Sequence, residues 1–244
     1  MTNTNIAQTN IAMWSGPRNI STALMYSFGN RADCFAWDEP FYGFSLKQGG
    51  HDHPMRDEVI AANECDWDKL VLACTIRATK PVFYQKHMTF HMEPGFDRSF
   101  ARKLTNAFLI RPPEEVLASY TQKWADASLR GIGFVQQSEI FDMVANHLGH
   151  APPVIEAHQV LENPRASLTK LCTALNIPFD KAMLKWPSGP KSFDGVWAPH
   201  WYNAVWQSEG FAAASPKVIA LSPELQKIAD QARPYYEKLK AHIL

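Results

Sequence analysis

A segment near the N-terminus, residues 15–22, combines the residue types that bind phosphate. It follows the apolar run 11–14, which is typical of a buried strand, and it leads into a segment with helical spacing. Backbone N–H groups and the positive end of a helix dipole converge at such a turn and favour an anion there. Arg18 adds a full charge, and Ser21 and Thr22 add hydroxyl donors. The segment predicts either a phosphate site or an ordinary turn with a capping serine, and these residues alone do not separate the two.

A second pair of candidate anion ligands, Arg111 and Ser119, lies near the middle of the chain. Arg111 comes directly after the strand-like run 107–110, and Ser119 follows about two turns along an amphipathic helix expected over residues 114–124. A guanidinium at a strand end can pair with a phosphate, and the hydroxyl faces back toward it. In the alternative interpretation, Arg111 makes a structural ion pair and Ser119 is a hydroxyl on the helix surface.

Strands and helices alternate along the chain in the order that builds a parallel sheet. The expected strands are short apolar runs that end at turn residues, at 11–14, 34–37, 82–84, 107–110 and 153–157. Helices are expected to begin near residue 21, capped by Ser21 or Thr22, and near residues 114, 140, 163 and 223. Residues 46–56 are expected to form an irregular surface connection, and residues 186–211 an irregular aromatic tail. The aromatic residues of this tail either belong to the core, which we favour, or line a ligand pocket. We therefore expect an α/β fold with a central parallel sheet flanked by helices, whose ligands bind beyond the carboxyl ends of the strands.

The bulk composition limits the class of protein. With 244 residues, 46% of them hydrophobic, the chain can bury a full core, and we expect one domain over residues 1–244 with residues 1–10 as a disordered leader. Lys plus Arg equals Asp plus Glu at 24 each, so no global field attracts nucleic acid or an anionic membrane. Four cysteines without a CxxC pair, and no apolar run of about 20 residues, indicate a cytoplasmic protein that does not enter a membrane. Oligomeric state cannot be read from these features.

The two candidate anion segments resemble the signatures of the sulfotransferase family. The phosphosulfate loop of that family reads like PKSGTT, and residues 17–22, PRNIST, align with it position by position. The segment that binds the 3′-phosphate in the family reads approximately RxPxxVxxS, and residues 111–119 satisfy this pattern throughout. The resemblance spans most of the chain, but these two motifs are the parts of the sequence that are specific to the family. It implies a P-loop NTPase-like sulfotransferase fold and the cofactor 3′-phosphoadenosine 5′-phosphosulfate, with adenosine 3′,5′-bisphosphate as its product.

The first motif implies a set of ligands for the 5′-phosphate side of the cofactor. These are Arg18, Asn19, Ile20, Ser21 and Thr22. Arg18 stands where the family has a lysine that contacts the bridging oxygen, so it is also a catalytic candidate. An arginine stays protonated and can stabilise leaving-group charge, but it is a poor proton donor. Ile20 is a second departure, because the family has a small glycine at that position.

The second motif and a late fragment imply the ligands for the 3′-phosphate. The second motif assigns Arg111 and Ser119 to this phosphate. Lys191 matches the basic residue of a KGxxGDW-like loop that closes on the nucleotide, although residues 191–197 lack its first glycine and its aspartate. The alternative for Lys191 is an exposed lysine that precedes an aromatic core segment.

Two residues are candidates for the base that takes a proton from the acceptor. Glu39 resembles the glutamate base of the carbohydrate-acting branches of the family, and its aromatic neighbours Phe41 and Tyr42 would raise its basicity by partial burial. His87 sits where the small-molecule branch has the histidine of its KTH motif. We favour Glu39, and the alternatives are a salt bridge for Glu39 and a buried structural role for His87. Lys86 is placed to help neutralise the transferring sulfonate.

The function expected from these residues is transfer of a sulfonate to a hydroxyl or amine of a small molecule or carbohydrate. No metal site is expected, because His51 and His53 share a loop without a second ligand cluster. A nucleotide-dependent kinase is the first alternative, although Ile20 stands where the GxxxxGKS/T loop has its lysine. A catalytically inactive nucleotide-binding protein is the second. The acceptor itself cannot be read from the sequence.

Overall fold

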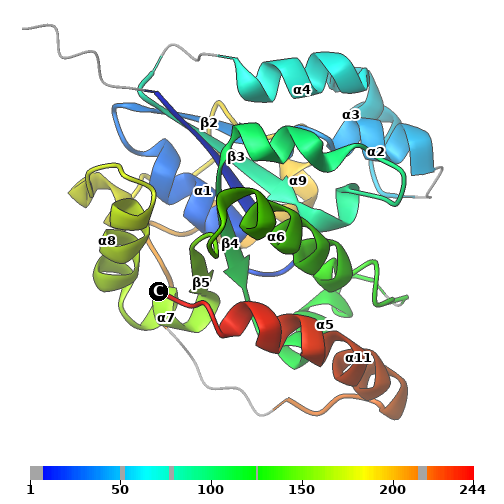
Figure 1. The fold of residues 1–244 in the computed structure, drawn as a ribbon. Helices are drawn as coiled ribbons and strands as arrows, with labels where there is room; N and C mark the ends of the chain where they lie inside the picture. Colours follow the sequence, from blue (N-terminus) through cyan, green and yellow to red (C-terminus); the bar gives the residue numbers. More distant parts are fainter. Residues whose placement is uncertain (1–7, 50–52, 77–79, 125, 214–218) are drawn as a thin grey trace, which may run out of the picture.

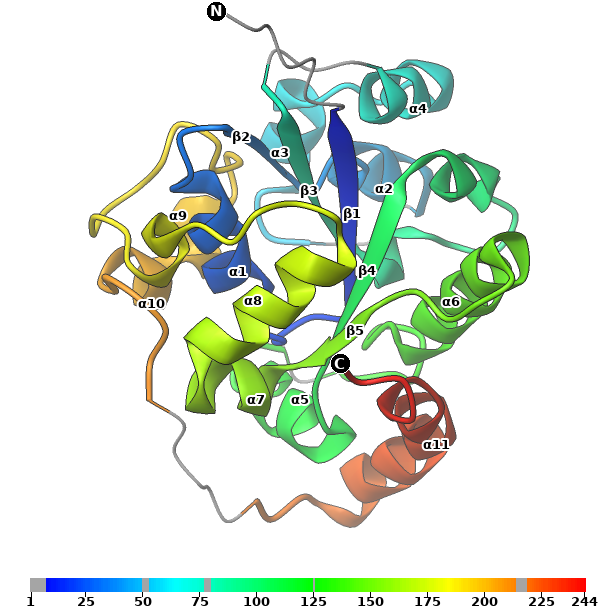
Figure 2. The same ribbon diagram turned by 60° about the vertical axis from the view of Figure 1, so that its left-hand side comes forward.

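The central feature of the fold is a sheet of five parallel strands. The computed structural model describes residues 8–49, 53–76, 80–124, 126–213 and 219–244. The strands pair in the order β2-β3-β1-β4-β5, and every pairing is parallel (Figure 2). Their bounds are Thr9–Ser15 for β1, Cys34–Asp38 for β2, Val82–Met88 for β3, Thr105–Ile110 for β4 and Val154–Glu156 for β5. The expected fold class, a central parallel sheet flanked by helices, is therefore confirmed.

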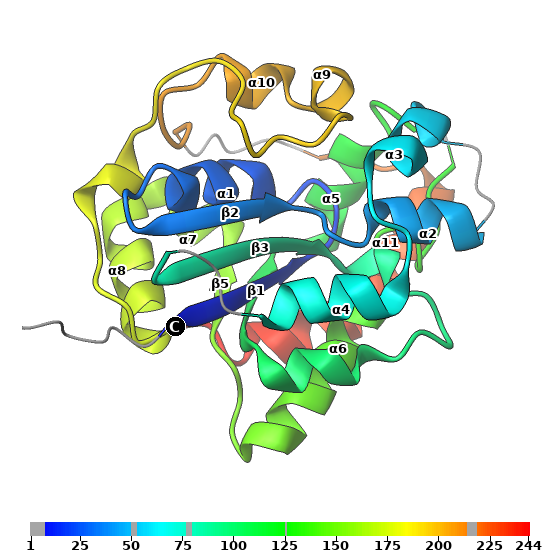
Figure 3. The same cartoon turned by 90° about the horizontal axis from the view of Figure 1, so that it is seen from above.

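Helices cover both faces of this sheet (Figures 1 and 3). The side chains of α1 (Ser21–Gly29), α8 (Pro164–Ala174) and the short helices α9 (Ala198–Trp201) and α10 (Asn203–Trp206) pack on one face. Those of α4 (Trp67–Thr75), α5 (Pro113–Tyr120), α6 (Phe134–Leu148) and α11 (Pro223–Lys240) pack on the other. The remaining elements are α2 (Tyr42–Gly49), α3 (Arg56–Ala62), α7 (Ala157–Glu162) and the 3-10 helices η1 (Thr89–His91), η2 (Arg98–Lys103) and η3 (Lys181–Leu184). No helix among the described residues has the length and apolar character needed to cross a bilayer.

Strand β1 shows why the core strands could be recognised from their residues. Its side chains alternate between the two layers, since Ile11 and Met13 pack with the α1 and α8 side while Ala12 and Trp14 pack with the α6 and α11 side. A strand buried on both faces must be apolar at successive positions, not only at alternate ones. This requirement produces the continuous run that marked β1 in the sequence.

The structure corrects several expectations about element boundaries. Helix α1 is not capped by Ser21 or Thr22, because Ile20 is its N-cap residue and no side chain makes a capping hydrogen bond. Residues 46–49 belong to α2 and not to an irregular connection, because Leu46 packs into the core and is only 4% exposed. Strand β1 begins at Thr9, inside the expected leader, of which residues 1–7 lie outside the described part of the chain.

Three further helices were not expected. Helix α7 follows β5 directly, so the chain turns into a helix one residue after the strand ends. The aromatic tail contains α9 and α10 and is regular where an irregular segment was expected. All three are only four to six residues long, and helices this short carry little periodic signal in the sequence.

The parallel register gathers the carboxyl ends of the strands at one edge of the sheet. Ser15 at the end of β1 pairs with Met88 of β3 and with Leu109 of β4, and Asp38 at the end of β2 pairs with Lys86. The loops that follow these strands therefore emerge side by side. These loops and the first turn of α1 carry the predicted site residues, except Lys86 and His87, which lie in β3, Ser119, which lies near the end of α5, and Lys191.

Candidate active site

The loop between β1 and α1 has an unusual backbone. Arg18 has a φ of 61° and Ile20 a φ of 56°, both in the left-handed region. This region is sparsely populated by residues other than glycine, and least of all by a β-branched residue such as isoleucine. Left-handed residues in a turn let successive backbone N–H groups face one anion. Ile20 therefore keeps the backbone conformation that a glycine adopts without strain.

Two predicted anion ligands, Arg18 and Arg111, meet at the end of this loop. The Nη1 group of Arg111 donates to the backbone carbonyl of Arg18 at 2.8 Å, and Arg18 Nε donates to Ser119 Oγ at 3.0 Å. Burial and the nearby charge of Arg111 lower the pKa of Arg18. Two neighbouring guanidinium groups leave an excess of positive charge at the end of the loop, which an anion would relieve.

Glu115 and His158 were not predicted from the sequence, yet they hold Arg111. Glu115 accepts from Arg111 Nε at 2.9 Å and also from His158 Nε2. Burial opposes the charge of Glu115, but the hydrogen bonds from His158 and Arg111 outweigh it and lower the pKa of this carboxyl. The i, i+4 spacing of Arg111 and Glu115 was a signal for this pair. Nothing in the sequence pointed to His158, which comes from α7.

The other predicted loop residues face different surroundings. Asn19 is buried, donates to the Leu109 carbonyl at 3.3 Å, and leaves its Oδ1 without a partner among the described residues. Ser21 is also buried, and among the described residues the one hydrogen-bond partner of its hydroxyl is the Met88 sulfur, at 4.0 Å. Thr22 is half-buried, and its hydroxyl has no hydrogen-bond partner in the described part of the chain. Both hydroxyls are thus available at the N-terminus of α1.

Lys191 makes no contact with the two arginines among the described residues. Its ammonium donates to three carbonyls of its own loop, those of Pro187, Ser188 and Gly189, at 2.6, 3.3 and 3.1 Å. The same ammonium lies 5.5 Å from the centre of the Tyr26 ring in α1. Lys191 therefore packs against the helix that carries Ser21 and Thr22, but it does not join Arg18 and Arg111.

A buried ionic cluster occupies the ends of β2 and β3. Lys86 donates to Asp38 Oδ1 at 2.9 Å, to Glu39 Oε1, and to the Tyr202 hydroxyl at 2.8 Å. The Tyr202 hydroxyl in turn donates to Asp38 Oδ2 at 2.7 Å. Asp38 and Tyr202 were not among the predicted site residues, while the burial of Tyr202 agrees with the core position expected for the aromatic tail. The cluster therefore joins three separate parts of the chain, namely the end of β2, strand β3 and the segment that contains Tyr202.

Glu39 has the protonation properties of a base that works near neutral pH. Burial raises the pKa of Glu39, the positive charge of Lys86 lowers it, and the negative charge of Asp38 raises it again. Together these effects bring the pKa to about 7. Its backbone φ of 42° is also in the left-handed region, which is uncommon for a glutamate and frequent at functional sites. His91 Nε2 lies 3.7 Å from Glu39 Oε2. A carboxyl with this pKa can accept a proton at physiological pH.

His87 lies on the opposite face of β3 from Lys86 and Glu39. Its ring stacks on Trp14 with centroids 4.5 Å apart and contacts Phe41, while its Nε2 is 3.0 Å from Gln85 Oε1. Burial lowers its pKa to about 3. The side chain is therefore neutral at physiological pH and surrounded by core residues.

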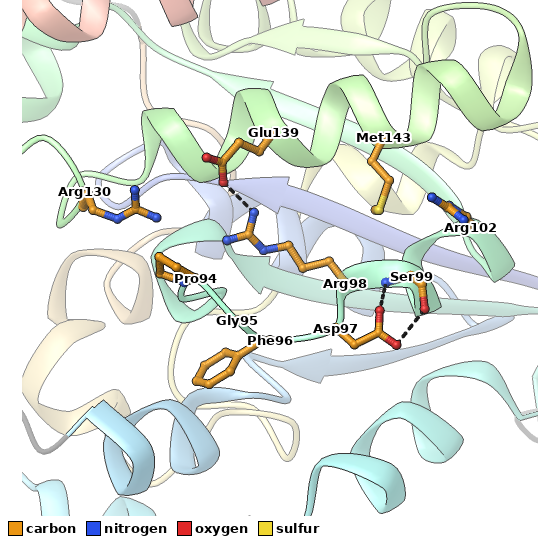
Figure 4. A pocket seen from close by; sticks show the side chains of 10 residues that line it. All are labelled: Pro94, Gly95, Phe96, Asp97, Arg98, Ser99, Arg102, Arg130, Glu139 and Met143. Atoms are coloured by element: carbon orange, nitrogen blue, oxygen red, sulfur yellow. Dashed lines mark hydrogen bonds and ion pairs between the residues drawn. The ribbon is translucent and has the colours of Figure 1, made fainter.

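A pocket of about 410 Å³ lies between η2 and α6 (Figure 4). Arg98 extends across it and pairs with Glu139 at 2.6 Å, and Arg102 and Arg130 also line it. None of the residues that line this pocket is a predicted site residue.

Among the described residues, no group of three or more His, Cys, Asp or Glu side chains is arranged to hold a metal ion. His51 lies outside the described part of the chain, and His53 bonds to the Tyr42 hydroxyl.

Comparisons with known sequences add an independent line of evidence. The profile of the family described as "Sulfotransferase domain" matches residues 9–243. The chain is 36% identical over 236 residues to branched-chain-amino-acid aminotransferase-like protein 1 of Arabidopsis thaliana, and 33% identical over 234 residues to protein 2 of the same name. Each match covers 96% of this chain and 42% of the plant protein. The chain thus spans less than half the length of these relatives.

Solved structures with a similar fold are sulfotransferases. A sulfotransferase from Alicyclobacillus acidocaldarius has a TM-score of 0.58 at 11% identity, with 96% of this chain and 95% of that chain covered. The sulfotransferase domain of the curacin biosynthetic pathway has a TM-score of 0.51 at 17% identity, with 93% and 98% covered. A mouse sulfotransferase complexed with PAP has a TM-score of 0.51 at 13% identity, with 97% and 89% covered. At these identities the likeness concerns the fold.

Proposed function

The chain belongs to the sulfotransferase family, and on that premise we propose that it moves a sulfonate from 3′-phosphoadenosine 5′-phosphosulfate to a hydroxyl or amine of a small-molecule or carbohydrate acceptor. The observation that carries this proposal is the meeting of Arg18 and Arg111. Their contact at 2.8 Å brings two anion-binding segments from distant parts of the chain to one place. A nucleotide with phosphate at both ends of its ribose needs such a paired site.

The residues of the β1–α1 loop fit the 5′-phosphate side of this cofactor. The left-handed backbone at Arg18 and Ile20 suits an anion facing several N–H groups, and Ser21 and Thr22 offer hydroxyls at the start of α1. Asn19 helps to fix the loop, through its bond to the Leu109 carbonyl. When bound, the cofactor supplies the sulfonate and its phosphate leaving group.

The residues that follow β4 fit the 3′-phosphate. Arg111 is held by Glu115 through Nε and by the Arg18 carbonyl through Nη1, which leaves Nη2 for a phosphate oxygen. Ser119 supports the neighbouring Arg18 guanidinium. We also assign Lys191 to this phosphate, which requires its ammonium to leave the three carbonyls that it binds here.

Glu39 is the base in this proposal. It takes the proton of the acceptor, and its raised pKa of about 7 balances the deprotonated fraction against proton affinity at neutral pH. Lys86 contributes a fixed positive charge beside it, because the carboxylates of Asp38 and Glu39 outweigh burial and raise the pKa of this ammonium. His87 is the weaker candidate, since its ring is neutral, buried among aromatic residues and on the other face of the strand.

Free thiols support a cytoplasmic location for this activity. All four cysteines are free, and Cys34, Cys74 and Cys172 are buried. Proteins of this size in oxidising compartments commonly carry disulfides, whereas reducing compartments keep thiols free.

A binding experiment separates the proposed function from its alternatives. Isothermal titration calorimetry with adenosine 3′,5′-bisphosphate is expected to show saturable binding, and ATP with magnesium is expected to bind far more weakly. A preference for ATP would favour a kinase, and silence toward both ligands would favour a protein without a nucleotide site. Turnover is then measured with the labelled sulfonate donor and a panel of phenols, amines and sugars.

A further inference from the structure

The ammonium of Lys86 has no hydrogen-bonding capacity left over. A lysine has three N–H donors, and here they are directed to Asp38 Oδ1, Glu39 Oε1 and the Tyr202 hydroxyl. The side chain is only 2% exposed, so water does not complete its shell. Lys86 can therefore meet a new partner only by releasing one of these three.

The hydroxyl of Tyr202 is equally saturated. It accepts from Lys86 at 2.8 Å and from Trp197 Nε1 at 3.2 Å, and it donates to Asp38 Oδ2 at 2.7 Å. The residue lies between α9 and α10, and the neighbouring backbone N–H of Gly195 also donates to Asp38 Oδ2, at 3.3 Å. One segment near the C-terminus thus fixes both a carboxylate of β2 and an ammonium of β3.

The charges in this cluster do not cancel. Asp38 and Glu39 compete for one ammonium, and the donor from Tyr202 satisfies part of the demand of Asp38. The part of the Lys86 charge that Asp38 does not take up stabilises the ionised carboxylate of Glu39. The hydroxyl of Tyr202 therefore influences a carboxyl that it does not touch.

We propose that Tyr202 is a positioning residue of the reaction, whose hydroxyl holds Asp38 and Lys86 so that Glu39 keeps enough of the Lys86 charge to act as a base near neutral pH. The proposal rests on the proposed function for its role in catalysis. Its structural part, the control of Glu39 by Tyr202, can be measured without turnover.

The same arrangement would let Lys86 change partner during sulfonate transfer. The O–H bond of the acceptor breaks and its proton goes to Glu39, the acceptor oxygen bonds to sulfur, and the bridging S–O bond breaks with its electron pair on the 5′-phosphate. A neutral Glu39 no longer forms an ion pair with Lys86. Tyr202 and Asp38 still hold two of the three N–H groups, and the third becomes available to an oxygen of the transferring sulfonate.

The remaining groups near Glu39 do not obscure its titration. His91 from η1 lies 3.7 Å from Glu39, and burial and the charge of Lys86 hold its pKa well below the usual value, so it is neutral. Tyr42 is the first residue of α2, and burial raises its pKa, so its side chain is neutral as well. Among the described residues that surround Glu39, Asp38 from β2 and Lys86 from β3 are the charged ones.

The first test measures the pKa of Glu39 directly. Carbon-13 NMR of protein labelled at the glutamate carboxyls follows Glu39, assigned by its loss in Glu39→Gln. Tyr202→Phe leaves Asp38 with a stronger demand for Lys86, and the Glu39 midpoint is expected to rise by about one pH unit. Asp38→Asn removes the competing carboxylate, and the midpoint is expected to fall. A general loss of packing would not shift the Glu39 midpoint in opposite directions in Tyr202→Phe and Asp38→Asn.

A matched control removes a hydroxyl from the same strand face. Tyr84 lies two residues before Lys86, and its buried hydroxyl has no partner among the described residues. Tyr84→Phe is therefore expected to leave the Glu39 midpoint unchanged. A Tyr202→Phe midpoint equal to that of Tyr84→Phe would overturn the proposal, and so would a fall of the midpoint. If Tyr202→Phe does not fold, Asp38→Asn tests the competition for Lys86 on which the proposal depends, and an unchanged or raised Glu39 midpoint in that variant would overturn it.

The second test uses turnover. Tyr202→Phe is expected to lower kcat about tenfold with the KM for the sulfonate donor within twofold, and to move the acid limb of the pH profile upward. Unchanged kcat and pH profile, in a wild type that does transfer sulfonate, would reduce Tyr202 to a packing role. A wild type that transfers nothing contradicts the proposed function, while the NMR titration still decides whether Tyr202 controls Glu39.

Discussion

The guanidinium of Arg111 donates a hydrogen bond to the backbone carbonyl of Arg18 at 2.8 Å, although the two residues are 93 positions apart in the sequence. Each residue follows a different strand, and the two strands, β1 and β4, are neighbours in the sheet. The contact therefore depends on the parallel register, which brings the two strand ends to the same edge. Nucleotide binding is expected to depend on both arginines.

Arg111→Ala is expected to weaken the binding of adenosine 3′,5′-bisphosphate by about 1.5–3 kcal/mol, the range for a charge-assisted hydrogen bond. Isothermal titration calorimetry measures this difference. Arg233→Ala is the matched control, because Arg233 of α11 also pairs with a glutamate, Glu114 of α5, but is not among the residues proposed to bind the nucleotide. Equal affinities for the two variants would remove Arg111 from the site.

The contact between Arg18 and Ser119 is expected to contribute to the same binding site. Ser119→Ala removes the acceptor of Arg18 Nε, which lies at 3.0 Å, and is expected to weaken nucleotide binding by about 0.5–1.5 kcal/mol. A double-mutant cycle with Arg18→Ala isolates the interaction, and a coupling energy above about 0.5 kcal/mol is expected for residues in direct contact. Strictly additive losses would mean that Ser119 does not act through Arg18.

The strands and the two anion segments could be predicted because their signals are local. Strand β1 is buried on both faces and therefore apolar at successive positions, and Arg111 and Ser119 lie within one short stretch. The alternation of side chains along β3 could also have separated two candidates. Lys86 and His87 are adjacent in a strand, so they must face opposite layers, and only one of them can share a site with Glu39.

The ionic cluster could not be predicted because its members are distant in sequence. Tyr202 reaches Lys86 across 116 positions, and only the packing of α9 and α10 on the sheet brings them together. In the sequence, Tyr202 is one of several aromatic residues in a tail, which favours a core position. The left-handed conformation of Ile20 could not be predicted for a different reason. An isoleucine disfavours this backbone conformation, and the surrounding fold imposes it.

Glu39→Gln is expected to lower kcat by about two to four orders of magnitude while nucleotide affinity stays within twofold. The amide keeps the shape of the side chain but cannot take the acceptor's proton. Turnover and calorimetry are measured on the same preparations. His87→Asn tests the other candidate base, and a greater loss of kcat with full nucleotide affinity in that variant would transfer the role to His87.

The pH dependence of activity is expected to follow the protonation of Glu39. A base must be ionised to work, and Glu39 has a pKa of about 7, so kcat/KM is expected to rise through pH 7 and level off above it. The acid limb should disappear in the residual activity of Glu39→Gln. A limb centred near pH 4.5, the ordinary value for a glutamate, would mean that Lys86 compensates fully for burial.

The free energy of unfolding is expected to depend on pH through the protonation of Glu39, and the direction of this dependence follows from the pKa shift. The folded pKa of Glu39, about 7, lies above its ordinary value of 4.5, so the folded state binds the proton more tightly than the unfolded state. The contribution of Glu39 to stability is then fully present below pH 4.5 and is lost as the pH rises from about 4.5 to 7. Glu115 has a lowered pKa, so its contribution is present at neutral pH and is lost as the pH falls below 4.5. Urea denaturation of the wild type, Glu39→Gln and Glu115→Gln from about pH 2.5 to pH 8 covers both ranges and separates the two contributions. Equal slopes in the two difference curves would contradict the assignment of opposite shifts to these carboxyls.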